Sequence, residues 1–557
     1  MRKPSISTGA LVGALLTAPL IAVLFLAGRL FGVPFVPFDI FDWLARVLPG
    51  AVVTIGIDLI VDVVTLLGLG LSEAAKAAEQ ALAVAIFLLT GVVVGAVLFG
   101  IYRARPTSSR YLPAVLLGLA LGLIALLISL TVNTTATTSP LVSGIWILLA
   151  FVAWGAAFAW VHNRLSAPLA SAAGSAAEVS TMQRLDRRRF LVRVGSATAI
   201  ITVVGTGLGA LLRGEGRGRL ADGAPVDAPV DALVDGPVDA PVQALWSQRN
   251  PLPNAGAEVE PAPGTRPEFT LPSDHYRIDI NLLPPTVDGA EWRLRVGGLV
   301  GVPREFTLDE LRSYEAMHQF ITLSCISNPL GGDLIDTTRW TGVSMQRLLP
   351  DLGLAEDATH LRISSVDDFY EYVSLETIEA DDRVMLAYQW DGLPLPTENG
   401  YPLRIYIPDV YGMKQPKWID RIEAVNGWAE GFWVERGWDE QAQVRSTSVI
   451  DTVAAEAPVS SAGGETLIPV GGIAFAGARG ISRVEVQVDD GDWQEAQLRE
   501  PLSDLTWVIW RYEWPFEEGQ HTFTVRCFDG NGDLQIVERN PVRPGGATGL
   551  SSESVRL

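Results

Sequence analysis

Long apolar runs in the first 213 residues constrain the fold of this chain more than any other feature of its sequence. Uncharged stretches long enough to cross about 30 Å of hydrocarbon occur at residues 8–28, 80–102, 111–134, 139–161 and 194–212. A sixth run, at residues 48–72, carries Asp58 and Asp62. We therefore expect residues 1–213 to form an α-helical transmembrane bundle of six spans, with the lipid bilayer as its partner.

The distribution of Arg and Lys predicts how this bundle is oriented, because cytoplasmic loops are richer in these residues. In a six-span arrangement, the loops around Arg103–Arg110 and Arg184–Arg193 fall on one side of the membrane, and the other side holds fewer basic residues. The sequence thus predicts a multi-pass protein of the cell membrane. Its N-terminus and everything after residue 213 would lie outside the cytoplasm.

The two acids of the run at 48–72 lie one helical turn apart, so both carboxylates would share one helix face. Acids inside a membrane are costly, which favours a functional site such as a proton or quinone-linked relay. The alternative is an amphipathic or poorly inserted helix whose acids meet water. A haem with two histidine ligands in the bundle is excluded, since His162 is the only histidine before residue 275.

The sequence just before the last apolar run resembles a twin-arginine export signal placed inside the chain. It reads Arg187-Arg188, one residue, then Phe190-Leu191, and an uncharged run ends at Leu212. Arginines that merely anchor the cytoplasmic end of a helix are the alternative.

Residues 214–264 have the composition of a linker. Between residues 224 and 242 they repeat a tetrad that begins Ala224-Pro225-Val226-Asp227. Regular prolines and mutually repelling acids prevent a helix and favour an extended chain. We expect this segment to tether a soluble part to the membrane.

Charge and cysteine content limit the partners of the soluble part. The net charge of −21, without a basic stripe, argues against nucleic acid as a partner. The only cysteines are Cys325 and Cys527, and Cys527 lies in a pattern typical of an ordinary strand. We expect no structural disulfide.

Two folded parts are predicted after the linker. Residues 265–445 mix alternating strand patterns, as in residues 403–407, with short amphipathic pieces, which indicates an α+β domain. Residues 446–545 show short alternating strands and turns such as Asp529-Gly530-Asn531-Gly532, which indicates a β-sandwich.

Cys325 ends an apolar β-branched stretch and is followed by Ser327-Asn328-Pro329-Leu330-Gly331-Gly332. The stretch predicts a buried strand and the following residues a turn, so the thiol is expected where a strand runs into a loop. A lone cysteine in a strand is also often a small buried hydrophobe.

Several motifs in the same order resemble the molybdopterin-binding domain of the sulfite oxidase family. They are Cys325 with its loop, Trp340-Thr341-Gly342, residues 394–404 and residues 411–419, and the resemblance covers about residues 270–545. It implies a molybdopterin-dependent oxidoreductase with a molybdenum-molybdopterin cofactor and with Cys325 as the thiolate ligand of the metal. It also implies that residues 446–545 are an immunoglobulin-like domain that forms a homodimer, a merely supporting domain being the alternative.

The resemblance also implies which residues contact the pterin. Phosphate and a polar ring need cations and hydrogen-bond donors, whereas each Lys or Arg by itself could be a solvated surface charge. The cofactor-binding residues expected in this way are Tyr276, Arg277, Ser365, Asn399, Arg404, Gly412, Met413, Lys414 and Lys417.

The substrate is less constrained. Sulfite oxidases resemble one another in having Asn-Arg soon after the ligand cysteine, whereas here Asn328 is followed by Pro329. Arg339, Arg362 or Tyr370 would have to supply a substitute. We expect oxygen-atom transfer on a small S- or N-oxide or sulfite-like substrate, with a membrane or soluble electron carrier. A non-catalytic membrane interaction or transport protein that has kept the fold is the alternative.

Overall fold

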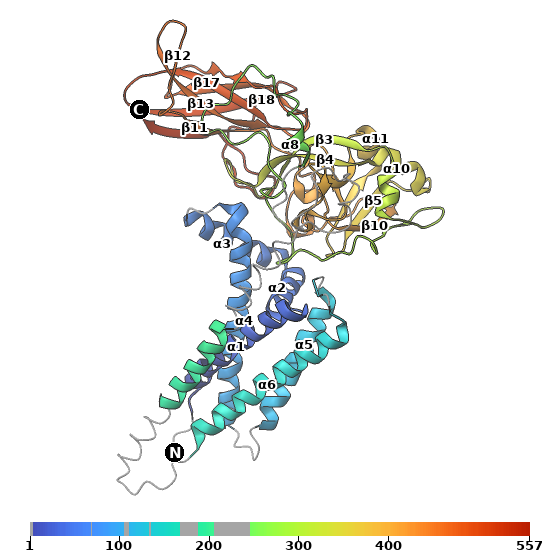
Figure 1. Cartoon of the computed structure of the whole chain (residues 1–557), viewed down its shortest axis with the longest axis vertical. Helices are drawn as coiled ribbons and strands as arrows, with labels where there is room; N and C mark the ends of the chain where they lie inside the picture. Colours follow the sequence, from blue (N-terminus) through green and yellow to red (C-terminus); the bar gives the residue numbers. More distant parts are fainter. Residues whose placement is uncertain are drawn as a thin grey trace. The chain divides into compact units, whose positions relative to one another are not determined.

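A computed structural model describes residues 4–67, 70–104, 111–132, 135–136, 138–167, 188–204 and 245–557. The chain divides into two compact units (Figure 1). The helical unit comprises residues 1–48, 76–224 and 280–286, and the soluble unit comprises residues 49–75, 225–279 and 287–557. The predicted domain boundaries at 213, 264, 445 and 545 remain predictions.

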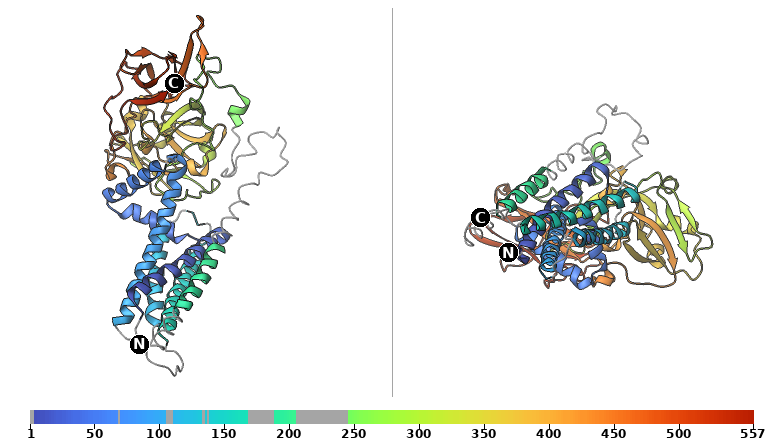
Figure 2. Two further views of the ribbon diagram at one scale, coloured as in Figure 1. Left: turned by 90° about the vertical axis from the view of Figure 1, so that its left-hand side faces the viewer. Right: turned by 90° about the horizontal axis from the view of Figure 1, so that it is seen from below.

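The helical unit contains long apolar helices that run side by side (Figure 2). The helices are α1 (Ile6–Phe31), α2 (Val36–Val47), α4 (Leu71–Ala104), α5 (Tyr111–Val132) and α6 (Pro140–Ser166), with a further helical stretch at residues 188–204. Small residues bring the backbones close together, as membrane helices often do. A Cβ atom at Gly155 would meet the Ala114 carbonyl oxygen of α5, and one at Gly118 would meet the Phe151 carbonyl oxygen of α6.

Four of the predicted spans coincide with helices that are long and apolar enough to cross a membrane, and one does not. Within the described residues, four helices are long and apolar enough to cross a membrane: Ile6–Phe31, Ala74–Ala104, Tyr111–Val132 and Pro140–Ser166. The run at 48–72 forms instead the 17-residue helix α3 (Gly50–Leu66), which is about 25 Å long and shorter than the hydrocarbon core. The predicted span at 194–212 and the Arg187-Arg188 pair lie partly outside the described residues.

The carboxylate of Asp58 does not behave as an intramembrane acid. Its side chain is 54% exposed and lies 3.2 Å from the guanidinium of Arg543. For Asp58, this favours the alternative expectation of an amphipathic or poorly inserted helix whose acids meet water. The buried acid of the helical unit is one that the sequence did not single out: Asp39 of α2 accepts a hydrogen bond of 2.5 Å from Ser129 of α5.

Two sheets form the α+β part of the soluble unit, one mixed and one antiparallel. One five-stranded sheet has the order β2-β1-β10-β5-β6, and another contains β3-β4-β7-β8 with β9 paired to β7. The strands are β1 (Leu294–Gly298), β2 (Arg304–Phe306), β3 (Met317–Ser324), β4 (Ile335–Ser344), β5 (His360–Ser365), β6 (Tyr370–Ser374), β7 (Met385–Trp390), β8 (Leu393–Pro394), β9 (Arg404–Tyr406) and β10 (Ile419–Val425). The helices among them are α9 (Leu308–Arg312), α10 (Met345–Leu352), α11 (Leu375–Ala380), η2 (Thr397–Asn399), η3 (Gly412–Lys414) and η4 (Val434–Arg436). Alternating residues of both sheets, such as Leu294 and Leu386, fill one core.

The C-terminal part is rich in β-strands, as predicted. One sheet has the order β11-β13-β17-β16, with β12 paired to β13, and the other has the order β15-β14-β18-β19. The strands are β11 (Thr447–Val453), β12 (Val459–Ser460), β13 (Thr466–Phe475), β14 (Ile481–Val488), β15 (Gln494–Glu495), β16 (Gln497–Leu498), β17 (Val508–Pro515), β18 (Gln520–Asp529) and β19 (Ser551–Arg556). Both sheets contribute to one core that includes Val470, Trp510, Val525 and Cys527.

The end of the predicted linker is packed rather than extended. The linker residues 214–244 lie outside the described residues. After them comes α8 (Leu245–Arg249), where the backbone N–H of Trp246 donates to the Asp391 carbonyl oxygen. Asn254 is 2% exposed. Apolar residues such as Trp246, which packs against Phe320, supply this packing.

Candidate active site

Cys325 lies where the sequence places it, directly after β3 and at the start of a loop. Its backbone N–H donates to the Leu334 carbonyl oxygen, and the Asn328 N–H donates back to the Cys325 carbonyl oxygen. The side chain of Asn328 accepts a bond from the Leu334 N–H at 2.9 Å. These bonds close the turn and hold the thiol in one position between β3 and β4.

The thiol of Cys325 is free, 7% exposed, and 3.0 Å from the hydroxyl of Ser327. Burial raises its pKa, while hydrogen bonds with Ser327 and the charge of Lys417 oppose the rise. A buried thiol becomes a thiolate when it coordinates a metal. This position therefore suits a metal ligand better than an exposed nucleophile.

Tyr276 and Asn399 are brought together beside Cys325. The side-chain amide of Asn399 donates to the Tyr276 carbonyl oxygen at 3.4 Å, and a Cβ atom on Gly412 would lie 3.5 Å from the Tyr276 hydroxyl. Burial raises the pKa of Tyr276 well above its ordinary value, and the neighbouring Cys325 adds to the rise. The phenol therefore stays protonated and can donate a hydrogen bond.

Arg404, the first residue of β9, is a buried cation without an acidic partner among the contacts that the structure describes. It is 3% exposed, and its guanidinium stacks 4.6 Å from the ring centre of Trp340. One amino group donates to the Asn399 carbonyl oxygen at 2.9 Å, whereas the Nε atom has no hydrogen-bond partner. Burial lowers its pKa to about 10, so the charge persists at neutral pH.

His275 belongs to this site although the sequence analysis did not select it. Its ring is buried against Trp390, with centroids 4.4 Å apart, and its Nε2 atom has no hydrogen-bond partner. Burial lowers its pKa to about 3, and the charges of Arg404 and Lys417 act in the same direction. The imidazole is therefore neutral at physiological pH. Only its place next to Tyr276 in the chain could have drawn attention to it.

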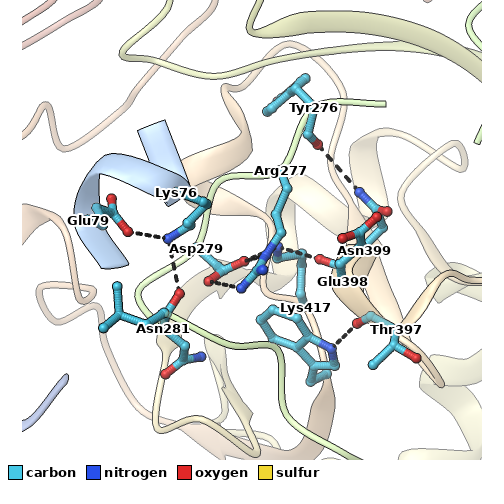
Figure 3. Close-up of polar contacts among 12 residues, drawn as sticks. Lys76, Glu79, Tyr276, Arg277, Asp279, Asn281, Thr397, Glu398, Asn399 and Lys417 are labelled. Atoms are coloured by element: carbon cyan, nitrogen blue, oxygen red, sulfur yellow. Dashed lines mark hydrogen bonds and ion pairs between the residues drawn. The ribbon is translucent and has the colours of Figure 1, made fainter. Parts of the chain in front are cut away.

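Lys417 and Arg277 converge on Asp279 (Figure 3). The ammonium of Lys417 lies 3.1 Å from the carboxylate of Asp279, and the Arg277 guanidinium lies 2.7 Å from the same group. Lys417 also donates to the Glu398 carbonyl oxygen. Burial lowers the pKa of Lys417 to about 8; Asp279 opposes this shift and Arg277 and Arg404 add to it. Two cations thus contact one carboxylate here.

The remaining predicted residues lie in neighbouring elements. Lys414 is ion-paired with the buried Glu371 of β6 at 3.1 Å, so its charge is already balanced. The side chain of Met413 packs in a hydrophobic cluster with Tyr411 and Trp438. Ser365 ends β5 opposite Ile419, and its buried hydroxyl has no partner.

The cations proposed for the substrate are engaged elsewhere. The Arg339 guanidinium lies 4.7 Å from the ring centre of Trp246. Arg362 is ion-paired with Glu423 at 3.0 Å and lies 4.8 Å from the ring centre of Tyr370. A small cavity of about 40 Å³ lies against the residue 328–332 loop and includes Arg266 in its lining, but Arg266 is ion-paired with Asp451.

The site has many buried polar atoms but no complete set of metal ligands. Hydrogen-bond partners are missing for Asn399 Oδ1, Arg404 Nε, His275 Nε2 and Ser365 Oγ. Buried polar atoms usually have a hydrogen-bond partner, so four atoms without one in this site are compatible with a polar ligand there. Within the described residues, no three His, Cys, Asp or Glu side chains gather in a way that could hold a metal. A metal at Cys325 therefore needs further ligands from a bound molecule.

Comparison with known proteins agrees with this chemistry. Residues 281–433 match the model of the oxidoreductase molybdopterin binding domain, a range that includes every predicted site residue except Tyr276 and Arg277. Human mitochondrial sulfite oxidase is 27% identical over 313 residues, which are 48% of this chain and 57% of that protein. A putative protein-methionine-sulfoxide reductase subunit YedZ1 of Azospira oryzae is 30% identical over 153 residues, 28% of this chain and 56% of that protein.

The chain thus spans just over half the length of these relatives. Among solved structures, the sulfane dehydrogenase SoxCD of Paracoccus pantotrophus matches with a TM-score of 0.47 and 18% identity, over 61% of this chain and 93% of that one. This likeness is too weak to carry an argument.

Proposed function

We propose that this chain, which carries a molybdopterin-binding oxidoreductase domain and apolar helices able to span a membrane, is a membrane-anchored enzyme that transfers an oxygen atom to or from a small S- or N-oxide or sulfite-like substrate. The observation that carries the proposal is the group of orphaned polar atoms of Asn399, Arg404 and His275 in the site of Cys325. A pterin, with its many donors and acceptors, satisfies such atoms.

The residues present fit the molybdenum-molybdopterin cofactor. Cys325 supplies one soft sulfur, and the pterin dithiolene supplies the others that the metal needs. Arg404 and Lys417 would provide positive charge for the anionic phosphate, and the Asn399 side-chain oxygen, which has no hydrogen-bond partner, could accept from a donor of the pterin. Gly412 leaves room beside the Tyr276 hydroxyl. The cofactor, when bound, supplies oxygen-atom transfer with a two-electron change at the metal.

The protein side chains then bind and orient rather than react. The protonated Tyr276 can donate to an oxygen of the substrate, and Arg404, fixed between its aromatic neighbours, keeps a positive charge in a dry site. The electrons would be exchanged with a membrane or soluble carrier.

The catalytic part is proposed to lie outside the cytoplasm. Suppose that α3 does not cross the membrane and that the helix at residues 188–204 does. The N-terminus with Arg2 and Lys3, the loop after Arg103 and the residues that precede the helix at 188–204 then all fall on the same side of the membrane. Basic residues favour the cytoplasm for this side. The expected side of the N-terminus is thereby reversed, whereas residues after 213 stay outside. The C-terminal sheets are proposed to be the immunoglobulin-like domain of a homodimer.

A paired arginine substitution tests the export route. Arg187→Lys with Arg188→Lys should keep the part after residue 213 in the cytoplasm if the motif is a twin-arginine signal. The measurement is protease accessibility of the soluble unit in spheroplasts. Full accessibility in the double variant would support a simple helix anchor instead.

Metal analysis and a substrate panel test the activity. Purified protein should contain molybdenum and molybdopterin, and it should turn over a neutral S- or N-oxide more efficiently than sulfite. The reason is that a desolvated dianion without a paired cation is penalised by several kcal/mol. In this proposal Arg404 and Lys417 serve the cofactor phosphate, and Arg339 and Arg362 are engaged elsewhere. With an artificial electron carrier, sulfite turnover above that of every oxide would contradict this preference. Protein free of molybdenum after expression with an adequate supply would contradict the enzyme itself.

A further inference from the structure

Helix α3 (Gly50–Leu66) presents one uncovered apolar face. Its exposed apolar residues are Val52 at 49%, Ile55 at 68%, Leu59 at 58%, Val63 at 45% and Leu66 at 86% exposure. Their spacing of three or four residues places them on a single stripe along the whole helix. A contiguous exposed stripe of this kind marks an interaction surface, whereas scattered apolar residues do not.

The opposite face of α3 is covered, and the beginning of the helix contacts the soluble unit. Thr54 is 6% and Val64 2% exposed. At the beginning of the helix, a Cβ atom on Gly50 would come within 2.8 Å of the Arg436 Cα atom, and α3 contacts η4 there. Asp58, beside the stripe, is ion-paired with Arg543. The helix is therefore held by one side while the stripe points away.

The segment after α3 is also fastened. The Asp333 carboxylate, in the loop that begins at Cys325, accepts from the backbone N–H of Ser72 and, at 2.6 Å, from its hydroxyl. Both ends of the segment thus belong to the soluble unit. The stripe is a fixed part of the surface of that unit rather than a side of a loose loop.

We propose that this stripe lies in the interfacial layer of the lipid bilayer and docks the soluble unit on the membrane. Chain continuity supports lipid as the occupant. The spanning helix that follows α3 begins at Ala74, eight residues after Leu66, so at most about 28 Å of extended chain separates the stripe from a membrane-spanning segment. Because α3 is about 25 Å long and so shorter than the hydrocarbon core, an exposed apolar stripe at that place would meet the boundary between headgroups and acyl chains.

The charges of α3 decide the kind of attachment. The helix contains Asp58 and Asp62 but no Lys or Arg. Attraction to anionic headgroups therefore contributes nothing, and the attachment rests on apolar burial alone. It should be the same in neutral and in anionic membranes and insensitive to salt, unlike that of basic interfacial helices. The inference is independent of the reaction catalysed.

Spin labels on the full chain in nanodiscs of neutral phosphatidylcholine test the proposal. One label replaces Leu59 as Leu59→Cys, and the matched control is Val302→Cys, an apolar position of the same unit that is 72% exposed. Both native cysteines are buried, so wild-type protein treated in parallel should take up little label. The Leu59 label should be relaxed by oxygen and protected from a water-soluble nickel complex by at least about threefold relative to the Val302 label.

Three other results would overturn the proposal. Equal access of the nickel complex to both labels would show that the stripe lies in water. A Leu59 label located at the bilayer centre would show that α3 is part of a membrane span. Spin–spin broadening that disappears when labelled protein is diluted with unlabelled protein would assign the stripe to a second copy of the chain. Molybdenum content measured on the same samples keeps these outcomes separate from the proposed enzyme function.

A charge substitution gives a second reading. Leu59→Glu together with Ile55→Glu should make a label at Val63→Cys accessible to nickel without changing molybdenum content. A label that stays protected in this variant would contradict attachment by the stripe. Replacing a third of the neutral lipid by anionic lipid should leave the protection of Leu59→Cys unchanged, and a marked increase would contradict the apolar mode of attachment.

Discussion

The two cysteines of this chain are both free and buried, yet their surroundings differ. Cys527 is 0% exposed in β18, which lies between β14 and β19, and it shares its core with Val525 and Trp510. Its backbone N–H is satisfied by Gln535. Cys325 lies at a strand end, in a site with orphaned polar atoms. Burial alone therefore does not identify a metal ligand. What sets Cys325 apart is its position at a strand end, beside the Ser327 hydroxyl and within the field of Lys417.

The largest expected effect separates the two thiols directly. Cys325→Ser should lower turnover by more than about 100-fold and reduce the molybdenum content, because a hydroxyl is a poor substitute for a thiolate and even substitutions outside the ligand shell cost 10–100-fold. Cys527→Ser should keep full activity and lose about 1–3 kcal/mol of stability, because a hydroxyl then lies in an apolar core. Undiminished turnover of Cys325→Ser would reject the role of Cys325.

Arginines near the two cysteines provide the next contrast. Arg404 is buried without an acidic partner, whereas Arg526 is 2.6 Å from Glu485 and stacks on Trp493. Arg404→Met should lower molybdopterin retention about tenfold or more but stabilise the cofactor-free protein by about 1 kcal/mol, because an unpaired buried charge is removed. Arg526→Met should neither lower molybdopterin retention nor stabilise the cofactor-free protein.

Pterin content and thermal unfolding of both forms measure these effects. A cofactor-free Arg404→Met protein that is less stable than wild type would show that Arg404 serves packing rather than the cofactor.

The sequence predicted the position of Cys325 better than it predicted the rest of the site around it. The position of Cys325 followed from local chemistry, because a β-branched run and an Asn-Pro-Leu-Gly-Gly turn both act over a few residues. Asn399, Arg404 and Lys417 came from a resemblance of motifs. His275 and Asp279 were missed because their roles depend on partners far away in the chain, such as Trp390 and Lys417.

The same limit explains the failed span at residues 48–72. Average hydropathy registers that the segment is apolar, but it cannot register where the helix ends or that Asp58 has a partner in Arg543, 485 residues later. The helix α3 is apolar enough for a membrane and too short to cross it.

A pH dependence should further distinguish the site of Cys325. In the cofactor-free protein, burial lowers the pKa of Lys417 to about 8, and only the protonated ammonium attracts a phosphate. Cofactor affinity should therefore be full below the lowered pKa and fall as the pH rises through 8, by about tenfold at one unit above it. Lys417→Arg, whose guanidinium stays charged, should remove this dependence. Binding titrations at several pH values measure it, and a flat wild-type profile would contradict the role of Lys417.

The smallest expected effect is a difference in alkylation rate between the two cysteines of the cofactor-free protein. Burial raises both pKa values, that of Cys527 to about 12, and only the thiolate reacts. Cys325 lies in a loop, whereas alkylation of Cys527 requires opening of a central strand. With iodoacetamide at mildly alkaline pH and peptide mass spectrometry, Cys325 should be modified several-fold faster, and bound molybdopterin should protect Cys325 without changing the rate at Cys527. Equal protection of both would mean that the cofactor acts through overall stability, and the contrast between the two sites would then be lost.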